Sequence, residues 1–206
     1  MIELLNCDCM DYMATLEDNA FDLAIVDPPY GIGVNHNMGR RAGQKSSGYK
    51  RAVWDSAPPP KEYFTEIMRV SRNQVIWGAN HFIDLIPIRS PCWLMWDKGF
   101  SGDVTFAQFE LAWTSFYSTC KKYDKSPNDI YRIHPTQKPV KLYQWLLTNY
   151  AKPGQRILDT HLGSGSSAIA AHYFGCDFVG CELDEDYYVA AKRRFTDETA
   201  QQALPI

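Results

Sequence analysis

The chain has 206 residues, of which 45% are hydrophobic and 22% are charged, and its formal net charge at pH 7 is −3. This length and composition fit one well-filled globular domain and exclude disordered, fibrous and collagen-like proteins. The sequence has no run of 18 apolar residues, which excludes a membrane-spanning helix, and Met1-Ile2-Glu3 lacks the pattern of a secretory signal. We therefore expect a cytoplasmic protein, in which the six cysteines are buried, reduced thiols.

Apolar runs rich in β-forming residues alternate with helical spacing of apolar residues along the chain. The runs predict strands at 21–26, 74–78, 92–96, 109–114, 156–159 and 177–181. Helical spacing predicts helices near 9–17, 60–71, 139–151, 166–174 and 184–195, the third of them with Pro139 at its first position. Short apolar strands separated by helices indicate an α/β fold with a Rossmann-like, doubly wound sheet covered on both faces.

Two long polar segments, 31–59 and 117–135, interrupt this alternation, and loops of such length in a compact domain are usually functional or disordered. The charges are distributed unevenly. Residues 1–30 hold seven acids and no base, whereas the basic loop 31–57 carries five basic residues against Asp55 alone. A negative net charge therefore hides a basic side that suits contact with nucleic-acid phosphates. Its candidate DNA-binding residues are Arg40, Arg41, Lys45, Tyr49, Lys50 and Arg51.

A glycine-containing turn follows the strand 156–159 and leads into the next helix, with Gly163 and Gly165 at its centre. Glycines here let the backbone approach a ligand closely, and the helix N-terminus offers free amide donors. The following strand ends at Glu182, nineteen residues after Gly163, where a carboxylate can accept hydrogen bonds from ribose hydroxyls. The pattern predicts a site for a nucleoside cofactor.

The turn alone leaves two cofactor classes open. Ala168 replaces the third glycine of a dinucleotide fingerprint, which is a tolerated variant, so NAD is not excluded. However, Asp159 lies where a pyrophosphate would approach, and it favours a ligand with a positive amino group, such as S-adenosylmethionine. Only about 40 residues follow the turn, too few to complete a doubly wound sheet. The missing strands must come from the N-terminal part, which predicts a circularly permuted order.

Asp27-Pro28-Pro29-Tyr30 directly follows the strand 21–26. The two prolines fix φ and cannot continue a sheet, so they keep the turn stiff. Asp27 and the carbonyl of Pro28 can accept both N–H bonds of an exocyclic amino group and aim its lone pair at an electrophilic methyl group. Tyr30 offers a flat face on which a base flipped out of a duplex can stack.

Four segments, in this order, resemble the permuted (β-order) family of DNA amino-methyltransferases. Asn6-Cys7-Asp8-Cys9 resembles the stretch whose acid binds the cofactor adenine, and Asp27-Pro28-Pro29-Tyr30 resembles the catalytic motif. Residues 134–139 (HPTQKP) resemble the segment around the methionine moiety, and 159–165 with 180–182 resemble the cofactor loop and its ribose-binding acid. The resemblance implies a class I S-adenosylmethionine-dependent methyltransferase fold, that cofactor, and double-stranded DNA as partner.

The resemblance also assigns roles to individual residues. It implies catalytic roles for Asp27, Pro28, Pro29 and Tyr30. It implies cofactor contacts for Asp8, Cys9, Asp27, Pro135, Thr136, Gln137, Lys138, Asp159, His161, Leu162, Gly163, Ser164, Gly165, Ser166, Glu182 and Leu183. The chain departs from the family in having Leu162 where Phe is usual, and in offering only 117–133 as a reduced target-recognition segment.

Residues 1–206 are accordingly expected to form a single catalytic domain of the kind found in restriction–modification systems, and members of the family often pair as a homodimer. Because Asp rather than Ser precedes Pro28, the resemblance favours the N6 amine of adenine over the N4 amine of cytosine. RNA or protein substrates, a nucleotide-dependent oxidoreductase and a non-catalytic DNA-binding module are the alternatives. The last two leave the Asp27–Tyr30 motif unexplained.

Other residues carry more ordinary expectations. Glu110 falls in an apolar strand, so it is either buried with a partner or faces the crevice. His134 is expected to be a turn residue and His161 to pack in the cofactor loop. Four tryptophans in strand runs, Trp77, Trp93, Trp96 and Trp113, are expected in the core, and Trp54 beside the basic loop is the best candidate for DNA contact.

Overall fold

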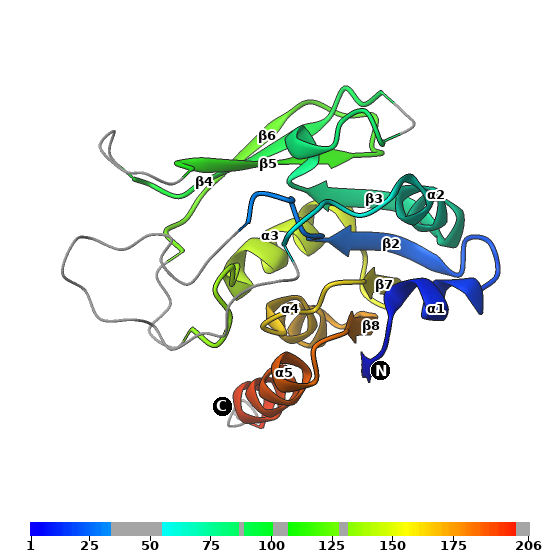
Figure 1. The fold of residues 1–206 in the computed structure, drawn as a ribbon. Helices are drawn as coiled ribbons and strands as arrows, with labels where there is room; N and C mark the ends of the chain where they lie inside the picture. Colours follow the sequence, from blue (N-terminus) through cyan, green and yellow to red (C-terminus); the bar gives the residue numbers. More distant parts are fainter. Residues whose placement is uncertain (34–54, 87–88, 101–106, 128–131, 201–206) are drawn as a thin grey trace.

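A computed structural model describes residues 1–33, 55–86, 89–100, 107–127 and 132–200 (Figure 1). The described part of the chain contains an eight-stranded sheet in the order β1-β8-β7-β2-β3-β5-β4-β6. The strands are β1 (Ile2–Asn6), β2 (Phe21–Val26), β3 (Ser71–Trp77), β4 (Trp93–Asp97), β5 (Phe109–Thr114), β6 (Lys121–Asp124), β7 (Arg156–Asp159) and β8 (Asp177–Glu182).

The sheet combines a parallel half with a mixed half. Strands β1, β8, β7, β2 and β3 run parallel to one another, whereas β5 lies antiparallel to both β3 and β4. Strand β7 lies between β2 and β8 near the middle of the sheet, although it comes late in the chain. The Rossmann-like fold and its permuted strand order, both predicted from the sequence, are confirmed.

Helices cover both faces of the sheet (Figure 1). The side chains of β2 alternate between the two cores that these helices form with the sheet. Leu23 and Ile25 join the core beneath α3 (Val140–Tyr150) and α4 (Ser166–Phe174), whereas Ala24 and Val26 join the core beneath α2 (Lys61–Val70). Alternate residues of a strand point to opposite faces, so a continuous apolar run is what a doubly covered strand requires. The remaining helices are α1 (Cys9–Ala14), α5 (Glu185–Thr199) and the short 3₁₀ helix Ala79–His81.

Several sequence expectations need correction. The polar segment 117–135, predicted as a loop, contains β6, which pairs with β4 through its backbone at the edge of the sheet. Lysines are common on edge strands because they discourage further pairing. Pro139 is the N-cap of α3 and not its first residue. Strand β1 was not predicted, since five residues of mixed polarity give a weak signal.

Side-chain burial agrees with most expectations for the core. Trp77, Trp96 and Trp113 are buried, while Trp93 is only partly buried. All six cysteines are free; three are buried, two are half-buried, and Cys120 is exposed, so the expectation of burial was too broad. Trp54 lies outside the described residues. Among the helices that the structure describes, none is both long and apolar enough to span a bilayer.

Candidate functional site

The described residues enclose a cavity of about 630 Å³ at the carboxyl ends of the parallel strands. Segments that follow β1, β2, β7 and β8 form its walls, together with residues 134–138 and the start of α2. This is the crevice in which open α/β sheets bind their ligands. Permutation therefore brings residues from both ends of the chain to one site.

The glycine loop between β7 and α4 is held from both sides. One carboxylate oxygen of Glu182 accepts a hydrogen bond from the backbone N–H of Gly163 at 2.8 Å, and the other accepts from the N–H of Asp184 at 3.0 Å. On the far side, Arg194 of α5 donates to the carbonyl of Ser164 at 3.1 Å. Gly165 has a φ of +75° and lies against Ala191, where a Cβ atom would approach the backbone oxygen to 3.3 Å. The loop conformation is therefore fixed by contacts that the chain itself supplies.

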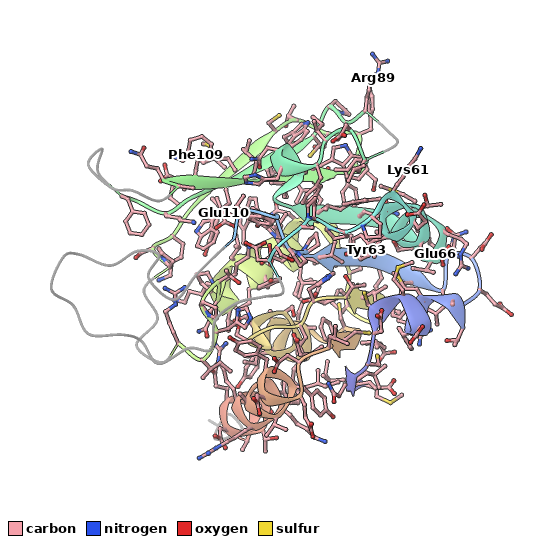
Figure 2. The ribbon with its side chains drawn as sticks, viewed as in Figure 1. Lys61, Tyr63, Glu66, Arg89, Phe109 and Glu110 are labelled. Carbon is pink, nitrogen blue, oxygen red and sulfur yellow. The ribbon has the colours of Figure 1, made fainter. Side chains whose placement is uncertain are left out.

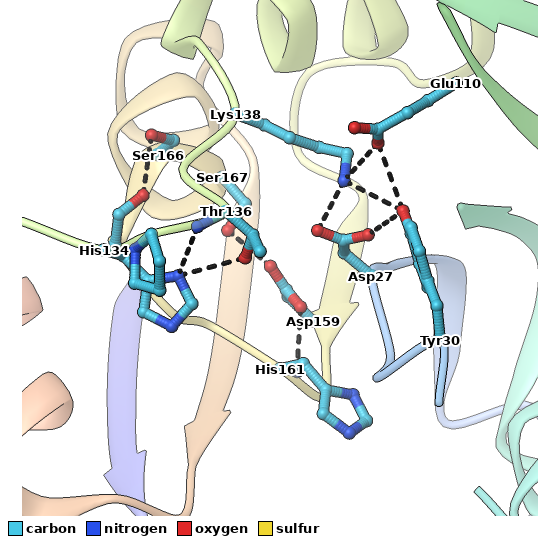
Figure 3. A network of polar contacts seen from close by, with 12 residues as sticks. Asp27, Tyr30, Glu110, His134, Thr136, Lys138, Asp159, His161, Ser166 and Ser167 are labelled. Carbon is cyan, nitrogen blue, oxygen red and sulfur yellow. Dashed lines mark hydrogen bonds and ion pairs between the residues drawn. The ribbon is translucent and has the colours of Figure 1, made fainter. Parts of the chain in front are cut away.

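Asp159 lies beneath this loop, with only 1% of its surface exposed. Its carboxylate accepts hydrogen bonds from the Ser167 hydroxyl at 2.6 Å and from the backbone N–H of His161 at 3.0 Å (Figure 3). Burial raises the pKa of Asp159 to about 7, and the two hydrogen bonds offset only part of that effect. The carboxyl group therefore titrates near neutral pH.

Two histidines in the cavity wall are neutral at physiological pH. Burial, together with the nearby charges of Lys138 and Arg132, lowers the pKa of His134 to about 4. The ring nitrogen Nδ1 of His134 contacts the Thr136 hydroxyl at 3.1 Å and so closes the turn before α3. Burial also lowers the pKa of His161 to about 4. Both side chains thus contribute shape and hydrogen bonds to the site rather than positive charge.

The Asp27–Tyr30 turn is the centre of a buried polar network (Figure 3). The Tyr30 hydroxyl donates to Oδ1 of Asp27 at 2.7 Å, and the Lys138 ammonium donates to Oδ2 at 2.5 Å. The same ammonium lies 2.9 Å from Oε2 of Glu110 on β5, and Lys98 holds Oε1 of Glu110 at 2.6 Å. Two carboxylates and two ammonium groups therefore meet at the end of β2, in balanced charge.

Burial and charge set the protonation of this network. Burial raises the pKa of the Asp27 carboxyl; the Lys138 ammonium opposes that rise, and Glu110 adds to it. Burial also acts to raise the pKa of Glu110, but Lys138 and Lys98 outweigh it and lower the value to about 2. Burial works against the charged form of Lys138, yet the two carboxylates hold its pKa above the usual value. Glu110 and Lys138 are consequently charged at neutral pH.

Backbone contacts fix the turn from outside the network. Oδ1 of Asp55 accepts hydrogen bonds from the backbone N–H groups of Tyr30 at 2.8 Å and Gly31 at 2.9 Å. The Tyr30 ring stacks on His81 with 5.1 Å between centroids and passes over Gly78, where a Cβ atom would come within 2.0 Å of it. No pattern in the sequence pointed to Asp55, Gly78 or Lys98, whereas Glu110 stood out as an acid in an apolar strand.

The structure separates the residues expected at the site into three groups. Those that line the cavity are Asp8, Cys9, Asp27, Pro29, Thr136, Gln137, Lys138, His161, Leu162, Gly163, Ser164, Glu182 and Leu183. Six others lie within two residues of lining residues in the chain without being among them: Pro28, Tyr30, Pro135, Asp159, Gly165 and Ser166. The expected DNA contacts Arg40, Arg41, Lys45, Tyr49, Lys50 and Arg51 fall outside the described residues.

Comparison with known proteins gives the chain a family. Putative methylase YubD from Escherichia coli (strain K12) is 27% identical over 216 residues, covering 94% of this chain and 90% of that protein. The crystal structure of the M1.HpyAVI–SAM complex superposes with a TM-score of 0.64 at 19% identity, covering 94% of this chain and all of that one. PvuII DNA methyltransferase (cytosine-N4-specific) has a TM-score of 0.63 at 10% identity, with 97% and 92% covered. These two likenesses show a shared fold. The family model for N6/N4 DNA methylases matches residues 76–193, more than half of the chain, and the protein therefore belongs to this DNA methylase family.

Proposed function

We propose that the protein transfers a methyl group from S-adenosylmethionine to the N6 amine of adenine in double-stranded DNA. The observation that carries the proposal is the Asp27 carboxylate, which ends β2 in a stiff turn and lines the same cavity as the glycine loop. Membership in the DNA methylase family supports the reaction class, and the S-adenosylmethionine complex of M1.HpyAVI supports the cofactor.

The cavity suits this cofactor in size and chemistry. Its volume of about 630 Å³ falls within the roughly 300–1,000 Å³ of small-molecule sites. The hydrogen bonds from Gly163 and Asp184 hold the Glu182 carboxylate at the cavity wall, where its remaining lone pairs can accept from ribose hydroxyls. Asp8, Glu182 and Asp184 give the walls a negative character beside the Asp27–Lys138 ion pair, which suits a ligand with an ammonium and a sulfonium group. When bound, S-adenosylmethionine supplies the electrophilic methyl.

The chain's own residues then bind and orient the amine. Asp27 and the Pro28 carbonyl accept its two N–H bonds, so that the nitrogen lone pair points at the methyl carbon. The lone pair would form the new C–N bond to the methyl group that the cofactor supplies, the cofactor would leave as its neutral thioether, and the Asp27 carboxylate, which accepts one of the N–H bonds, would take the proton that the nitrogen loses. Positioning and electrostatics are sufficient for such a displacement, and no covalent enzyme intermediate is required. The Tyr30 ring would stack on the flipped base.

Adenine is proposed over cytosine because Asp precedes Pro28, as the family resemblance favours. N4-methylation of cytosine is the second candidate, since the same two acceptors fit either amine. The fold shared with a cytosine-N4-specific enzyme is the observation in its favour.

The first experiment incubates the protein with tritiated S-adenosylmethionine and genomic DNA from a strain without DNA methylation, then identifies the labelled nucleoside after digestion. Label in N6-methyladenine is the expected result. Label in N4-methylcytosine would overturn adenine as the target base but would be consistent with the same mechanism of methyl transfer to an exocyclic amine. Label absent from DNA, with S-adenosylmethionine binding shown by calorimetry, would overturn DNA as the substrate.

Asp27→Asn tests the catalytic role. We expect it to lower turnover by at least about 100-fold, because the amide presents a donor where the amine needs an acceptor. Binding of S-adenosylmethionine, measured by calorimetry, should change by less than about threefold. The matched control is Glu66→Gln, which neutralises a carboxylate paired with Arg69 on α2, away from the cavity (Figure 2). Full activity in Asp27→Asn would contradict the mechanism.

A further inference from the structure

We infer that the Lys138 ammonium holds the place on Asp27 that the target amino group takes during the reaction, and that Glu110 is the positioning residue that receives Lys138 when the base enters. The inference deepens the proposed function and rests on it for the identity of the incoming amine. It adds a role for β5, a strand outside the cofactor-binding half of the sheet.

Both oxygens of the Asp27 carboxylate already have donors. Lys138 Nζ donates to Oδ2 at 2.5 Å, while the Tyr30 hydroxyl occupies Oδ1 at 2.7 Å. An ammonium and an exocyclic amino group are both nitrogen donors that seek the same carboxylate lone pairs. An amine that is to bind Asp27 must therefore replace one of these two donors or share an oxygen with it, and Lys138 is the donor that has a second carboxylate to move to.

Lys138 has an alternative partner within reach. Its Nζ already lies 2.9 Å from Oε2 of Glu110 and 3.2 Å from the Tyr30 hydroxyl. The long, flexible lysine side chain can leave Asp27 by a small movement without losing a charged partner. Lys98 fixes the other Glu110 oxygen at 2.6 Å, so the receiving carboxylate stays in place (Figure 3 shows Glu110 and Asp27 on either side of the ammonium).

Burial makes this second partner important. The Lys138 side chain is 3% exposed and those of Asp27 and Glu110 are 15% and 18% exposed, so water cannot easily replace a missing partner. With Glu110 present, the ammonium keeps an ion pair when the amine takes Asp27. Without Glu110, the amine would have to break the last ion pair of a buried cation. Glu110 therefore lowers the cost of exchanging lysine for substrate.

A double-mutant cycle tests this coupling. Initial rates on unmethylated genomic DNA give kcat and KM for the wild type, Glu110→Gln, Lys138→Met and the double variant. We expect Glu110→Gln to lower kcat/KM by about tenfold in the wild-type background and by less than about threefold in the Lys138→Met background. Glu110→Asp, which keeps the charge, should recover part of the loss. Thermal unfolding checks that each variant is folded, S-adenosylmethionine binding checks that Glu110→Gln keeps its cofactor site, and Glu66→Gln again serves as the control.

Two kinetic results would overturn the inference. One is an equal loss from Glu110→Gln in both backgrounds, which would mean that Glu110 acts independently of Lys138. The other is wild-type kcat/KM in Glu110→Gln. A role of Glu110 in packing alone would also reduce S-adenosylmethionine binding or thermal stability in proportion to the decrease in activity.

A second cycle separates this inference from the proposed function. Free energies of unfolding of Asp27→Asn, Lys138→Met and the double variant measure the contact between the two side chains without any substrate. We expect Lys138→Met to destabilise the wild type more than it destabilises Asp27→Asn. An additive result would overturn the inference even if the protein methylates DNA. Conversely, wild-type protein that labels no DNA would overturn the proposed function, while this cycle would still show whether Asp27 and Lys138 are energetically coupled.

Discussion

Two buried carboxylates near the cavity differ in protonation because their neighbours differ. Glu110 lies between two ammonium groups, and its pKa falls to about 2. Asp159 has neutral hydrogen-bond donors as neighbours, and burial raises its pKa to about 7. Residue type alone does not predict this difference, because it depends on which cations the fold brings within reach. Glu110 thus keeps a constant charge, whereas Asp159 changes charge in the physiological range.

Asp159 should make cofactor binding depend on pH. S-adenosylmethionine carries positive charge, so it should bind more tightly when Asp159 is ionised, by about fivefold between pH 6 and pH 8. Calorimetric dissociation constants across this range test the expectation, and Asp159→Asn should flatten the curve. Equal pH slopes in the wild type and the variant would contradict it.

The raised pKa of Asp159 also affects stability without ligand. The folded protein holds this proton more tightly than the unfolded chain does, so the contribution is full at low pH and is lost as pH rises through about 7.

At the residue level, the sequence predicts chemistry that depends on local position. Asp27 and Glu182 each stand at the carboxyl end of an apolar strand, and that placement indicates a site. Contacts between residues that are distant in the chain cannot be predicted in this way. Tyr30 meets Glu110 80 residues away and Lys138 108 residues away, and neither pairing leaves a periodic signal. The network around Asp27 is therefore a property of the fold.

At the scale of elements, the end of β3 supports the Asp27–Tyr30 turn from below. Gly78 adopts a φ of +71°, and the Tyr30 ring fills the space where a side chain would begin. The absence of a Cβ atom at this strand end thus lets Tyr30 reach Asp27. The end of β3 therefore helps to position Tyr30, which belongs to the turn after β2.

Gly78→Ala tests that role. A Cβ atom would lie 2.0 Å from the Tyr30 ring, so the ring must move, and we expect kcat to fall by about tenfold or more with S-adenosylmethionine affinity unchanged. Gly154→Ala is the matched control, because Gly154 has a similar φ of +82° and nothing within 4 Å of its Cβ position. Both variants carry the cost of left-handed backbone, about 1 kcal/mol in the free energy of unfolding, and only Gly78→Ala should lose turnover. Equal kinetics would contradict the role.

Helices and strands were predicted well where their burial requires a regular pattern of apolar residues in the sequence. Strand β2 is buried on both faces and reads as a continuous apolar run, and its predicted bounds match those observed. Strand β6, with the sequence KKYD, lies at the sheet edge and is held by backbone pairing to β4, which places no demand for apolar side chains. Of its four side chains only that of Tyr123 packs against the core, on Trp145, and one aromatic residue among polar ones gives too weak a pattern to predict a strand.

At the scale of the whole molecule, charge is distributed unevenly along the chain. The first 30 residues are acidic, and the stretch that follows Tyr30 is basic. A basic segment that directly follows the Asp27–Tyr30 turn in sequence suits a polyanionic substrate. The expectation of DNA contact there comes from the sequence, because these basic residues lie outside the described part of the chain.

Neutralising the basic loop should weaken DNA binding selectively. Replacing its five basic residues by glutamine should reduce affinity and lower the slope of log affinity against log salt, by up to about 0.9 for each phosphate that is no longer neutralised. Fluorescence anisotropy with duplex DNA over a salt series measures both, and S-adenosylmethionine binding should be unchanged. The control is Lys192→Gln with Arg193→Gln on α5. An unchanged salt slope would contradict the expected role. The residues replaced are Arg40, Arg41, Lys45, Lys50 and Arg51.

The strand order also constrains how the protein can fold as it is made. Ribosomes deliver β1 and β2 first, yet β1 has β8 as its neighbour, and β7 joins β2 to β8. Those partners emerge up to 176 residues later, a delay of roughly 10 to 35 s at about 5 to 20 residues per second. For that period the nascent chain exposes an unpaired strand edge and holds Asp27 without its glycine loop. A ribosome-bound chain shorter than about 180 residues therefore offers chaperones an open edge and has no complete cofactor site. The Asp27–Tyr30 turn is synthesised early, but the site around it is complete only after β8 has been made.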